Sequence, residues 1–410
     1  MVPNGWKLST IEEISSVSSG GTPSRKNESY WNGNIPWVTT AEVQFKIIED
    51  TAEKITEEGL ANSSAKLFPV DTILIAMYGQ GKTRGQVAKL GIEASTNQAC
   101  AAIILKAGYH VDYYYQFLIS QYDNIREMAN SGGQENLSGG IVKSIKVPVP
   151  PLPEQKKIAK ILSTWDKAIA TTEKLIDASQ QQKKALMQQL LTGKKRLVDP
   201  DTGKVFEGKW EEVKLDDLAL YRRGSFPQPY GNPEWVDEVN GYPFIQVFDI
   251  DKNMKLKKAT KTKISDAAID KSVFIEAGTV IVSLQGSIGR VAITQYDAYV
   301  DRTVLLFQSF KRKMDTIYFA YAIQELFEIE KEKAPGGTIK TITKQVLSNF
   351  TIKVPTHYEQ QKIASVLTAA DKEIELLQAK LAHLKDEKKA LMQQLLTGKR
   401  RVKVDENVAA

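Results

Sequence analysis

The sequence is poor in the residues that disulfides, metal sites and membrane spans require. One cysteine, Cys100, and three histidines exclude a disulfide framework and argue against a Cys/His metal site. No run of about 18 apolar residues predicts a membrane span. The first residues, MVPNGWKLSTIEE, lack the basic and apolar segments of a secretory signal. These absences predict a cytoplasmic protein without a membrane partner.

Catalytic motifs are also missing, although three segments imitate them. Residues 76–83, AMYGQGKT, fit a loose phosphate-binding loop, but the RGQVAKLGIEAS that follows has no helical face to cradle a phosphate. Residues 200–209, PDTGKVFEGK, imitate a nuclease metal site, but their carboxylates are too close in sequence, and the segment predicts a turn. Asn232-Pro233 lacks the rest of an amino-methyltransferase motif. We therefore expect no catalytic residue, metal or cofactor in this chain.

The length and the charge permit several functions. A chain of 410 residues predicts two to three domains. The apolar fraction of 42% and the charged fraction of 25% are ordinary for a globular protein. The formal net charge of +6 permits nucleic-acid binding but, at this length, does not demand it.

An internal repeat is the most informative feature of the sequence. KKALMQQLLTGK occupies residues 183–194 and returns unchanged at residues 388–399, an offset of 205 residues in a chain of 410. The segments EQ at 154–155 and KIA at 157–159 return at the same offset, and earlier segments match more loosely. The order of the chain is therefore domain, helix, domain, helix, with two divergent domains of about 150 residues.

Each helix carries a largely apolar seam at alternating steps of four and three residues. A seam sustained over this length predicts a coiled coil. The first helix ends where the second domain begins, so a compact linker predicts an antiparallel pair related by a pseudo-twofold axis. Gly193 and Gly398 lie where glycine caps are expected. The seam positions are Ile158, Leu162, Trp165, Ile169, Thr172, Ile176, Ser179, Lys183, Leu186 and Leu190, and the same positions 205 residues later.

The two domains predict an α+β fold of mixed strands and helices. Short β-branched runs such as TILIAM and TVIVSL, separated by Gly, Asn and Ser, predict strands. An aromatic, helix-like segment follows in each domain, then a Gly-rich loop, and then a strand that we expect a proline to end. The predicted boundaries are 1–150 for the first domain, 151–194 for the first helix, 195–209 for a linker, 210–355 for the second domain, 356–399 for the second helix and 400–410 for a tail.

Polar and basic residues in the turns of each domain are candidates for DNA contact. Two unlike domains at a fixed spacing suit a ligand with two reading points, which DNA offers along one face of the duplex. Lys and Arg bind phosphates or guanine edges, and Asn and Gln bind adenine edges. The alternative is that these are ordinary solvated loop residues. The candidates are Thr39, Thr40, Gln80, Lys82, Arg84, Asn97, Gln98, Gln134 and Asn136 in the first domain, and Gln246, Gln285, Arg290, Arg302, Lys340 and Lys344 in the second.

The repeated helix ends are candidates for protein contact. Packing requires Leu186, Leu190 and their neighbours, yet polar residues are identical in the two copies as well. Identical surfaces on both helix ends predict that two copies of one partner dock symmetrically. A recent duplication of this segment is the alternative. The candidate docking residues are Lys183, Lys184, Gln188, Gln189, Lys388, Lys389, Gln393 and Gln394.

These motifs resemble those of a known family. PLPEQKKIAKIL with KKALMQQLLTGKKR, the second copies YEQQKIASVL and KKALMQQLLTGKRR, and the segments GNIPWVTTAEV and GYPFIQVFDI look like the specificity subunit of type I restriction-modification enzymes. The resemblance covers the whole chain. It implies two target-recognition domains, each of which reads one half of a split, asymmetric double-stranded DNA site. It also implies that the helices set the unread spacer between the halves.

The resemblance places the chemistry in partner proteins. Two modification subunits, which are methyltransferases, would dock on the helices and supply S-adenosylmethionine and the adenine-methylating site. Restriction subunits would add translocation and cleavage that depend on ATP and Mg²⁺. The chain itself would be a non-catalytic recognition subunit. Two alternatives remain open, namely a stand-alone nuclease or methyltransferase, and a scaffold whose rod joins two protein-binding domains.

Overall fold

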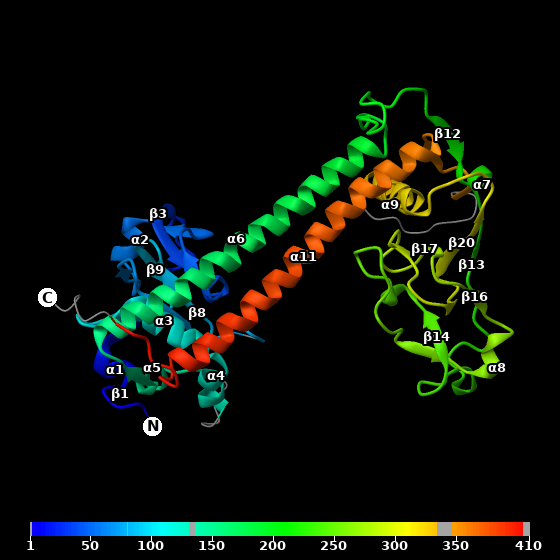
Figure 1. The fold of residues 1–410 in the computed structure, drawn as a ribbon. Helices are drawn as coiled ribbons and strands as arrows, with labels where there is room; N and C mark the ends of the chain where they lie inside the picture. Colours follow the sequence, from blue (N-terminus) through cyan, green and yellow to red (C-terminus); the bar gives the residue numbers. More distant parts are fainter. Residues whose placement is uncertain (1, 80, 131–135, 334–346, 405–410) are drawn as a thin grey trace. The chain divides into compact units, whose positions relative to one another are not determined.

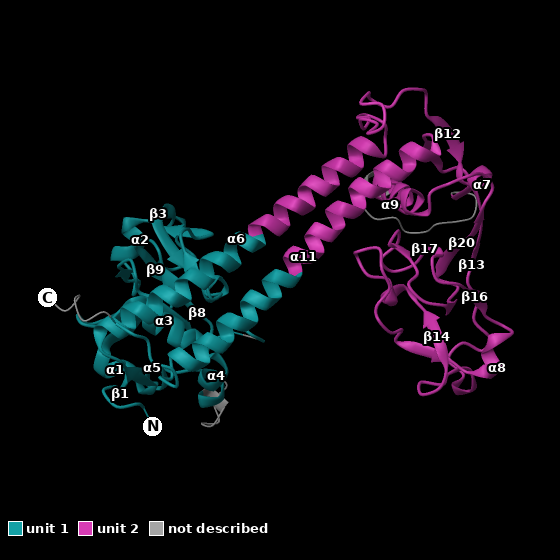
Figure 2. Ribbon diagram, viewed as in Figure 1, with its two compact units in different colours: residues 1–173, 379–410 teal, residues 174–378 magenta. Residues whose placement is uncertain are grey.

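The computed structural model describes residues 2–79, 81–130, 136–333 and 347–404. The chain divides into two compact units, of which unit 1 contains residues 1–173 and 379–410 and unit 2 contains residues 174–378 (Figure 2). The long helices α6 (Leu152–Leu190) and α11 (His357–Leu395) have 39 residues each and belong partly to both units. Each unit therefore combines its own domain with the start of one long helix and the end of the other. The division between the two units falls inside both long helices. It therefore does not test the predicted domain boundaries, which stay a prediction.

In the part that the structure describes, the domain of unit 1 contains three sheets and five short α-helices (Figure 1). The sheets have the strand orders β2-β10-β7-β8-β4, β5-β3-β9-β6 and β1-β11. The strands are β1 (Lys7–Thr10), β2 (Ser15–Ser19), β3 (Trp31–Val38), β4 (Ile47–Ile48), β5 (Glu53–Ile55), β6 (Leu67–Phe68), β7 (Ile73–Ala76), β8 (Val87–Leu90), β9 (Ala94–Thr96), β10 (Cys100–Leu105) and β11 (Lys146–Val149). The helices are α1 (Ile11–Ile14), α2 (Glu57–Ala61), α3 (Val111–Ser120), α4 (Tyr122–Asn130) and α5 (Gly139–Ser144).

The domain of unit 2 repeats this plan. Its sheets have the strand orders β13-β20-β17-β18, β15-β14-β19-β16 and β12-β21. The strands are β12 (Glu211–Lys214), β13 (Ala219–Arg223), β14 (Tyr242–Ile245), β15 (Thr262–Ile264), β16 (Val273–Ile275), β17 (Val280–Ser283), β18 (Val291–Ile293), β19 (Ala298–Val300), β20 (Val304–Phe310) and β21 (Thr351–Val354). The α-helices among the described residues of this domain are α7 (Leu215–Leu218), α8 (Asp266–Ile269) and α9 (Thr316–Lys333).

Both faces are buried in the sheet that contains β7 in unit 1 and in the sheet that contains β17 in unit 2. In β7, Ile73 joins a core with α3 and the long helices, whereas the next residue, Leu74, joins a core with the smaller sheet. In β17, Val280 and Ile281 divide between two cores in the same way. Successive strand side chains point to opposite faces, so a strand that excludes water on both sides is apolar throughout. This explains the continuous apolar runs TILIAM and TVIVSL.

Inside each unit, the start of one long helix lies antiparallel against the end of the other (Figure 1). In unit 1, Lys388 of α11 pairs with Asp166 of α6, with Nζ–Oδ1 at 2.5 Å. In unit 2, Lys183 of α6 pairs with Asp371 of α11, with Nζ–Oδ1 at 2.6 Å. Every predicted seam residue is buried or half-buried. The α+β fold class and the antiparallel coiled coil predicted from the sequence are therefore confirmed.

Two local expectations need correction. The last strand of the first domain, β11, continues through Pro148 and ends at Val149, although β21 does end before Pro355. A two-stranded sheet leaves each strand one free edge, where a proline removes no ladder hydrogen bond. The aromatic segment of the first domain is interrupted at Gln121, so it forms α3 and α4 instead of one helix.

Other local predictions are confirmed. The chain turns at Gly203, which has a φ of 67°, between the bridged residues Val198 and Val205. Gly193 and Gly398 follow the long helices with φ values of 71° and 72°, in the left-handed region that favours glycine. The segment that imitates a nuclease metal site is therefore a turn, and both helices end at the expected caps.

Candidate functional site

In the first domain, the loops that carry the candidate DNA-contact residues meet at one edge. β3 and β9 are parallel neighbours, so Thr39 and Asn97 follow their carboxyl ends, and the N–H of Asn97 donates to the last residue of β3 (3.0 Å). At the end of β7, the N–H of Met77 donates to the carbonyl of Ala99 (2.8 Å), and its carbonyl accepts from Leu137 (3.0 Å). The four loops that these contacts join therefore lie together.

Some of these candidates form hydrogen bonds that stabilise the local backbone. The N–H and the hydroxyl of Thr39 both donate to Glu42 (2.8 Å and 3.0 Å), which fixes the start of the 3-10 helix η2 (Thr40–Glu42). The side-chain carbonyl of Asn97 accepts from the N–H of Ala99 (3.1 Å) and shapes the turn before β10. The loop with Lys82 leads into strand β8 and not into a helix, so it lacks the helix N-terminus that a phosphate cradle needs. Of the remaining candidates, Lys82, Gln98 and Asn136 are exposed, Thr40 and Arg84 are half-buried, and Gln80 and Gln134 lie outside the described residues.

In the second domain, Gln246, Gln285 and Arg290 line one cavity of about 420 Å³. Its walls also include Tyr230 and Phe248, which are 48% and 41% exposed. Arg302 lies beside it, with its guanidinium carbon 5.4 Å from the centre of the Tyr230 ring. The structure thus brings these four candidates together, whereas Lys340 and Lys344 lie outside the described residues.

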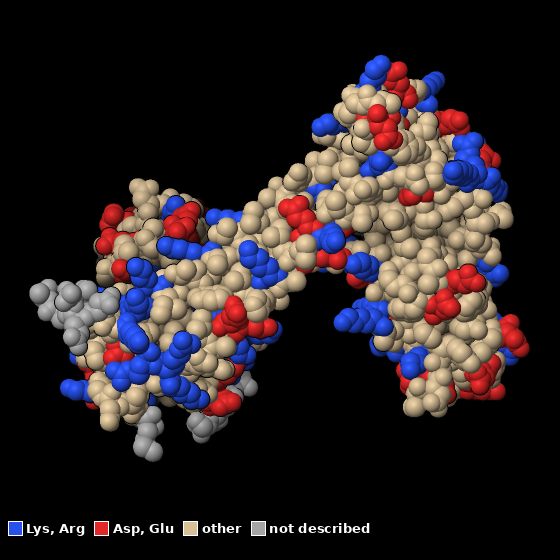
Figure 3. All heavy atoms as spheres, viewed as in Figure 1, with Lys and Arg blue, Asp and Glu red and all other residues tan. Residues whose placement is uncertain are grey.

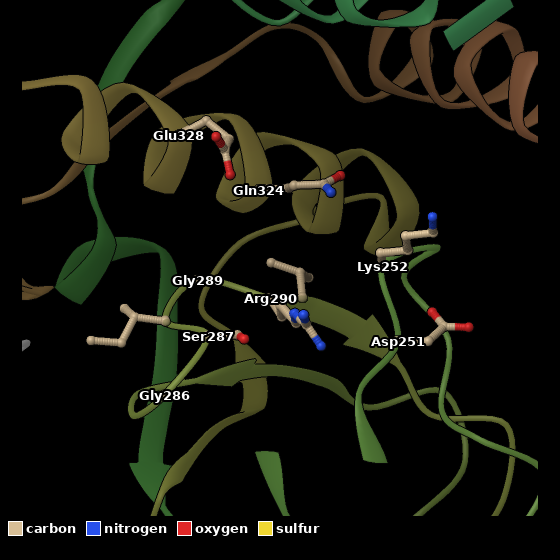
Figure 4. A pocket seen from close by; sticks show the side chains of 10 residues that line it. Asp251, Lys252, Gly286, Ser287, Gly289, Arg290, Gln324 and Glu328 are labelled. Carbon is tan, nitrogen blue, oxygen red and sulfur yellow. The ribbon is translucent and has the colours of Figure 1, made fainter. Parts of the chain in front are cut away.

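Arg290 also borders a second cavity, of about 430 Å³, which Figure 4 shows. The loop after β17 forms one wall, and α9 forms another with Gln324 and Glu328. Gly286 in this loop has a φ of 63°, which a residue with a side chain rarely adopts. Cationic Arg290 and anionic Glu328 line the same cavity, so its mixed charge gives no preference for a phosphate.

Sequence reasoning missed an aromatic and basic surface next to the 420 Å³ cavity. Phe248 is exposed, and the ammonium groups of Lys257 and Lys261 lie 5.9 Å and 5.2 Å from the centre of its ring. Both belong to residues 252–263, a segment with six lysines. That run of lysines was the signal available in the sequence. An exposed aromatic ring flanked by cations suits a polyanion with stacked bases.

The candidate docking residues at the helix ends fall into two groups. Lys184, Gln188 and Gln189 are exposed on α6, as are their repeats Lys389, Gln393 and Gln394 on α11. In unit 2, a cavity of about 500 Å³ is lined by Lys184 and Gln188 of α6 and by Glu325 and Glu328 of α9. In unit 1, Figure 3 shows Lys and Arg side chains gathered over the end of α11. Lys183 and Lys388, by contrast, are half-buried and ion-paired inside their own units.

The two half-buried lysines belong to a repeated three-residue contact, which we call the aspartate hub. In unit 2, Asp371 accepts from Lys183 on one oxygen and from the Tyr321 hydroxyl on the other. In unit 1, Asp166 accepts from Lys388 and from the side-chain amide of Gln116 in the same way. Burial, and then Asp371, raise the pKa of Tyr321, so its hydroxyl keeps the proton that it donates. Each hub joins both long helices to the aromatic helix of its domain.

A second contact is also repeated at the start of each long helix. Glu359 at the start of α11 accepts from Arg196 and from the indole N–H of Trp210 (3.2 Å). Glu154 at the start of α6 accepts from Arg401 and from Trp6 (3.3 Å) in the same pattern. Both glutamates are buried, and each guanidinium binds both oxygens of its carboxylate, the geometry that gives strong, directional pairing. The chain that follows each long helix is therefore fastened to the start of the other.

The described residues offer little for covalent or metal chemistry. Burial raises the pKa of the Cys100 thiol to about 12, so it stays protonated and unreactive. Across residues 2–79, 81–130, 136–333 and 347–404, no three His, Cys, Asp or Glu side chains group as ligands for a metal ion. In those same ranges, no helix has both the length and the apolar character needed to cross a membrane.

Comparison with known proteins agrees with this architecture. A family model described as the type I restriction modification DNA specificity domain matches residues 3–179 and 207–386. The putative type I restriction enzyme MjaX specificity subunit of Methanocaldococcus jannaschii is 29% identical over 422 residues, which cover 98% of this chain and 95% of that protein.

Solved structures show the same fold at low sequence identity. A chain from a study of complex assembly and conformational transition in the type I R-M system has a TM-score of 0.64 at 17% identity, covering 98% of this chain and all of its own. The type I restriction-modification S subunit from M. genitalium has a TM-score of 0.56 at 14% identity, covering 97% and 98%. With the family model matching both domains and most of both long helices, the chain belongs to the family of type I restriction-modification DNA specificity subunits and has two target-recognition domains.

Proposed function

We propose that each target-recognition domain of this chain reads one half of a bipartite, asymmetric DNA site, and that the paired helices set the unread spacer. The observation that carries this proposal is the contrast between unlike reading surfaces and identical helix ends. The surface of the first domain carries Lys82, Gln98 and Asn136, whereas that of the second carries Gln246, Arg290 and exposed aromatic rings. Different side chains at the two surfaces select different base sequences.

The identical helix ends serve as docking sites for two copies of a methyltransferase subunit. The aspartate hubs give Lys183 and Lys388 an internal reason to be identical, but they give none for the exposed residues Lys184, Gln188, Gln189, Lys389, Gln393 and Gln394. Two equal surfaces accept two equal partners. The cavity beside Lys184 and Gln188 provides a concave place on unit 2 for a partner side chain.

Catalysis takes place in the partner subunits. The methyltransferase subunits hold S-adenosylmethionine and transfer its methyl group to adenine, and restriction subunits hold ATP and Mg²⁺. This chain acts in the cytoplasm as the non-catalytic part that selects the sequence. A stand-alone nuclease or methyltransferase is the competing function. Incubation of the purified chain with DNA and either Mg²⁺ or S-adenosylmethionine tests it, and robust turnover would favour it.

The decisive experiment maps methylated adenines in host DNA by modified-base sequencing. Strains with and without this gene are compared in the presence of the partner methyltransferase gene. We expect one motif with two specific halves and an unread gap, methylated only when this gene is present. Methylation that is unaffected by the gene, or a motif without a gap, would refute the proposal. A scaffold of protein-binding domains would leave the assembled complex without sequence-selective DNA binding.

A further inference from the structure

Gln246 lies at the start of the 3-10 helix η4 (Val247–Asp249), where the backbone and the side chain are both held. Its N–H donates to Asp249 (2.9 Å), which caps η4 and fixes the backbone. Its side-chain Nε2 lies 2.9 Å from the Tyr230 hydroxyl, and its Oε1 lies 3.1 Å from the Thr262 hydroxyl. The side chain is half-buried at the wall of the 420 Å³ cavity. A glutamine anchored at both ends of its amide loses the rotational freedom of a surface side chain.

The direction of the hydrogen bonds fixes which way the amide points. The buried carboxylate of Asp301 accepts from the N–H of Thr303 (2.9 Å) on one oxygen, and it accepts from the Tyr230 hydroxyl (3.3 Å) on the other. Both Asp301 oxygens act as acceptors in these bonds, so the Tyr230 hydroxyl uses its single O–H to donate a hydrogen bond to Asp301. The Tyr230 oxygen then acts only as an acceptor toward Gln246. The NH₂ group of Gln246 must therefore face Tyr230, and its carbonyl must face Thr262.

A rotation of the amide by half a turn would disrupt the contact with Tyr230. The Gln246 carbonyl would then face the Tyr230 oxygen, which has no proton left to share, and two oxygens would stand at hydrogen-bond distance. Burial, and then Asp301, raise the pKa of Tyr230, so the hydroxyl keeps its proton near neutral pH. Hydrogen bonds therefore link Asp301, Tyr230, Gln246 and Thr262 in series, and the donor of each bond is fixed.

The amide retains hydrogen-bonding capacity that these contacts do not use. A glutamine amide has two N–H donors and two acceptor positions on its oxygen. Tyr230 takes one donor and Thr262 takes one acceptor position, so one donor and one acceptor remain. In the major groove, adenine offers an N7 acceptor next to an N6 donor. Guanine offers two acceptors, cytosine one donor and thymine one acceptor. Adenine is the single base whose edge complements a neighbouring donor and acceptor.

We propose that Gln246 reads one adenine in the half-site of the second target-recognition domain, and that Tyr230, Asp301 and Thr262 act as positioning residues that fix its amide. This inference rests on the proposed function and names one base contact within it. Arg302 beside Tyr230, and Lys257 and Lys261 beside Phe248, supply positive charge next to the cavity for the DNA backbone.

The first test uses the complete complex with its methyltransferase and the methylated motif of the wild-type protein. Each adenine of the half-site read by the second domain is replaced in turn by 7-deaza-adenine, which lacks N7, or by purine, which lacks the N6 amino group. We expect one adenine at which both analogues weaken binding, by roughly 5- to 150-fold. The protein is unchanged in this test, so a folding defect cannot imitate the result. No position sensitive to both analogues would overturn the inference.

Variants then connect that position to Gln246. Gln246→Ala is expected to relax the motif at that single base pair in modified-base sequencing and to abolish the effect of 7-deaza-adenine there. Tyr230→Phe, which frees the amide to rotate, relaxes the same position more weakly. The control is Gln308→Ala, since Gln308 is exposed on β20 and does not line the cavity.

The outcomes separate this inference from the proposed function. If the wild-type complex methylates no bipartite motif, the proposed function fails and this inference fails with it. If the motif is bipartite but Gln246→Ala leaves every position unchanged, the adenine contact alone is refuted. A relaxed position in the half-site of the first domain would also refute it, because Gln246 belongs to the second. A stable Gln246→Ala complex with one relaxed position supports it.

Discussion

The aspartate hub of unit 2 gives a quantitative prediction about what holds the coiled coil to its recognition domain. The side chains of Lys183 and Asp371 are 15% and 26% exposed. The replacement Asp371→Asn leaves Lys183 half-buried without its counter-charge, and Asn offers a single acceptor for two donors. Hydrogen bonds to charged groups contribute about 1.5–3 kcal/mol each. We therefore expect Asp371→Asn to destabilise the protein by about 2 kcal/mol.

The measurement is a double-mutant cycle with Lys183→Met, followed by thermal and urea unfolding. A loss of about 2 kcal/mol lowers the melting temperature of a unit of this size by about 4–8 °C. The coupling between the two substitutions should be about 1.5 kcal/mol and should persist in high salt, because the pair is largely shielded from water.

The matched control is the ion pair between Lys385 and Glu173, which also joins α11 to α6. Its side chains are 52% and 48% exposed, so its coupling should be about 0.5 kcal/mol or less and should vanish in salt. A coupling between Lys183 and Asp371 that is no larger than that of the control pair would refute the reasoning. Lys183 and its repeat Lys388 would then be better explained as docking residues.

Four further predictions test other parts of the account. Alanine at Gln188, Gln189, Gln393 and Gln394 should weaken pull-down of the co-expressed methyltransferase without changing the melting temperature, because these side chains are exposed; intact assembly would contradict the docking proposal. One heptad inserted into both long helices should lengthen each by about 10 Å and the unread spacer by about 3 bp; an unchanged spacer in modified-base sequencing would contradict the proposal that the helices set its length. Exchange of residues 1–150 for another domain of this family should change one half of the methylated motif, and a change in both halves would defeat modular recognition. Burial lowers the pKa of His110, so the stability that neutral His110 contributes is present above about pH 6.5 and is lost as the pH falls through the lowered pKa. His110→Gln should therefore remove part of the acid-side loss in unfolding measured between pH 7 and 5, and an unaltered pH profile would contradict that assignment.

The division of the candidate residues shows where sequence reasoning reached its limit. The docking surface was predicted from identity between the two copies, yet identity alone does not separate Lys183, which pairs inside the chain, from Lys184, which is exposed. Likewise, turn composition drew attention to Gln246 and Arg290 but missed Tyr230. A tyrosine in a loop carries no sign of its partners, and those partners decide what it does.

The sequence by itself determined the internal repeat, the two long helices and their heptad seam, and the apolar strands. Each of these depends on a periodic pattern that a local stretch of chain contains in full. Tertiary structure alone decided the partners of Asp371 and the orientation of the Gln246 amide. Lys183 and Asp371 are separated by 188 positions, and Tyr230 and Asp301 by 71. Hydrogen-bond partners so far apart in the chain are chosen by how the elements pack, so no local pattern encodes them.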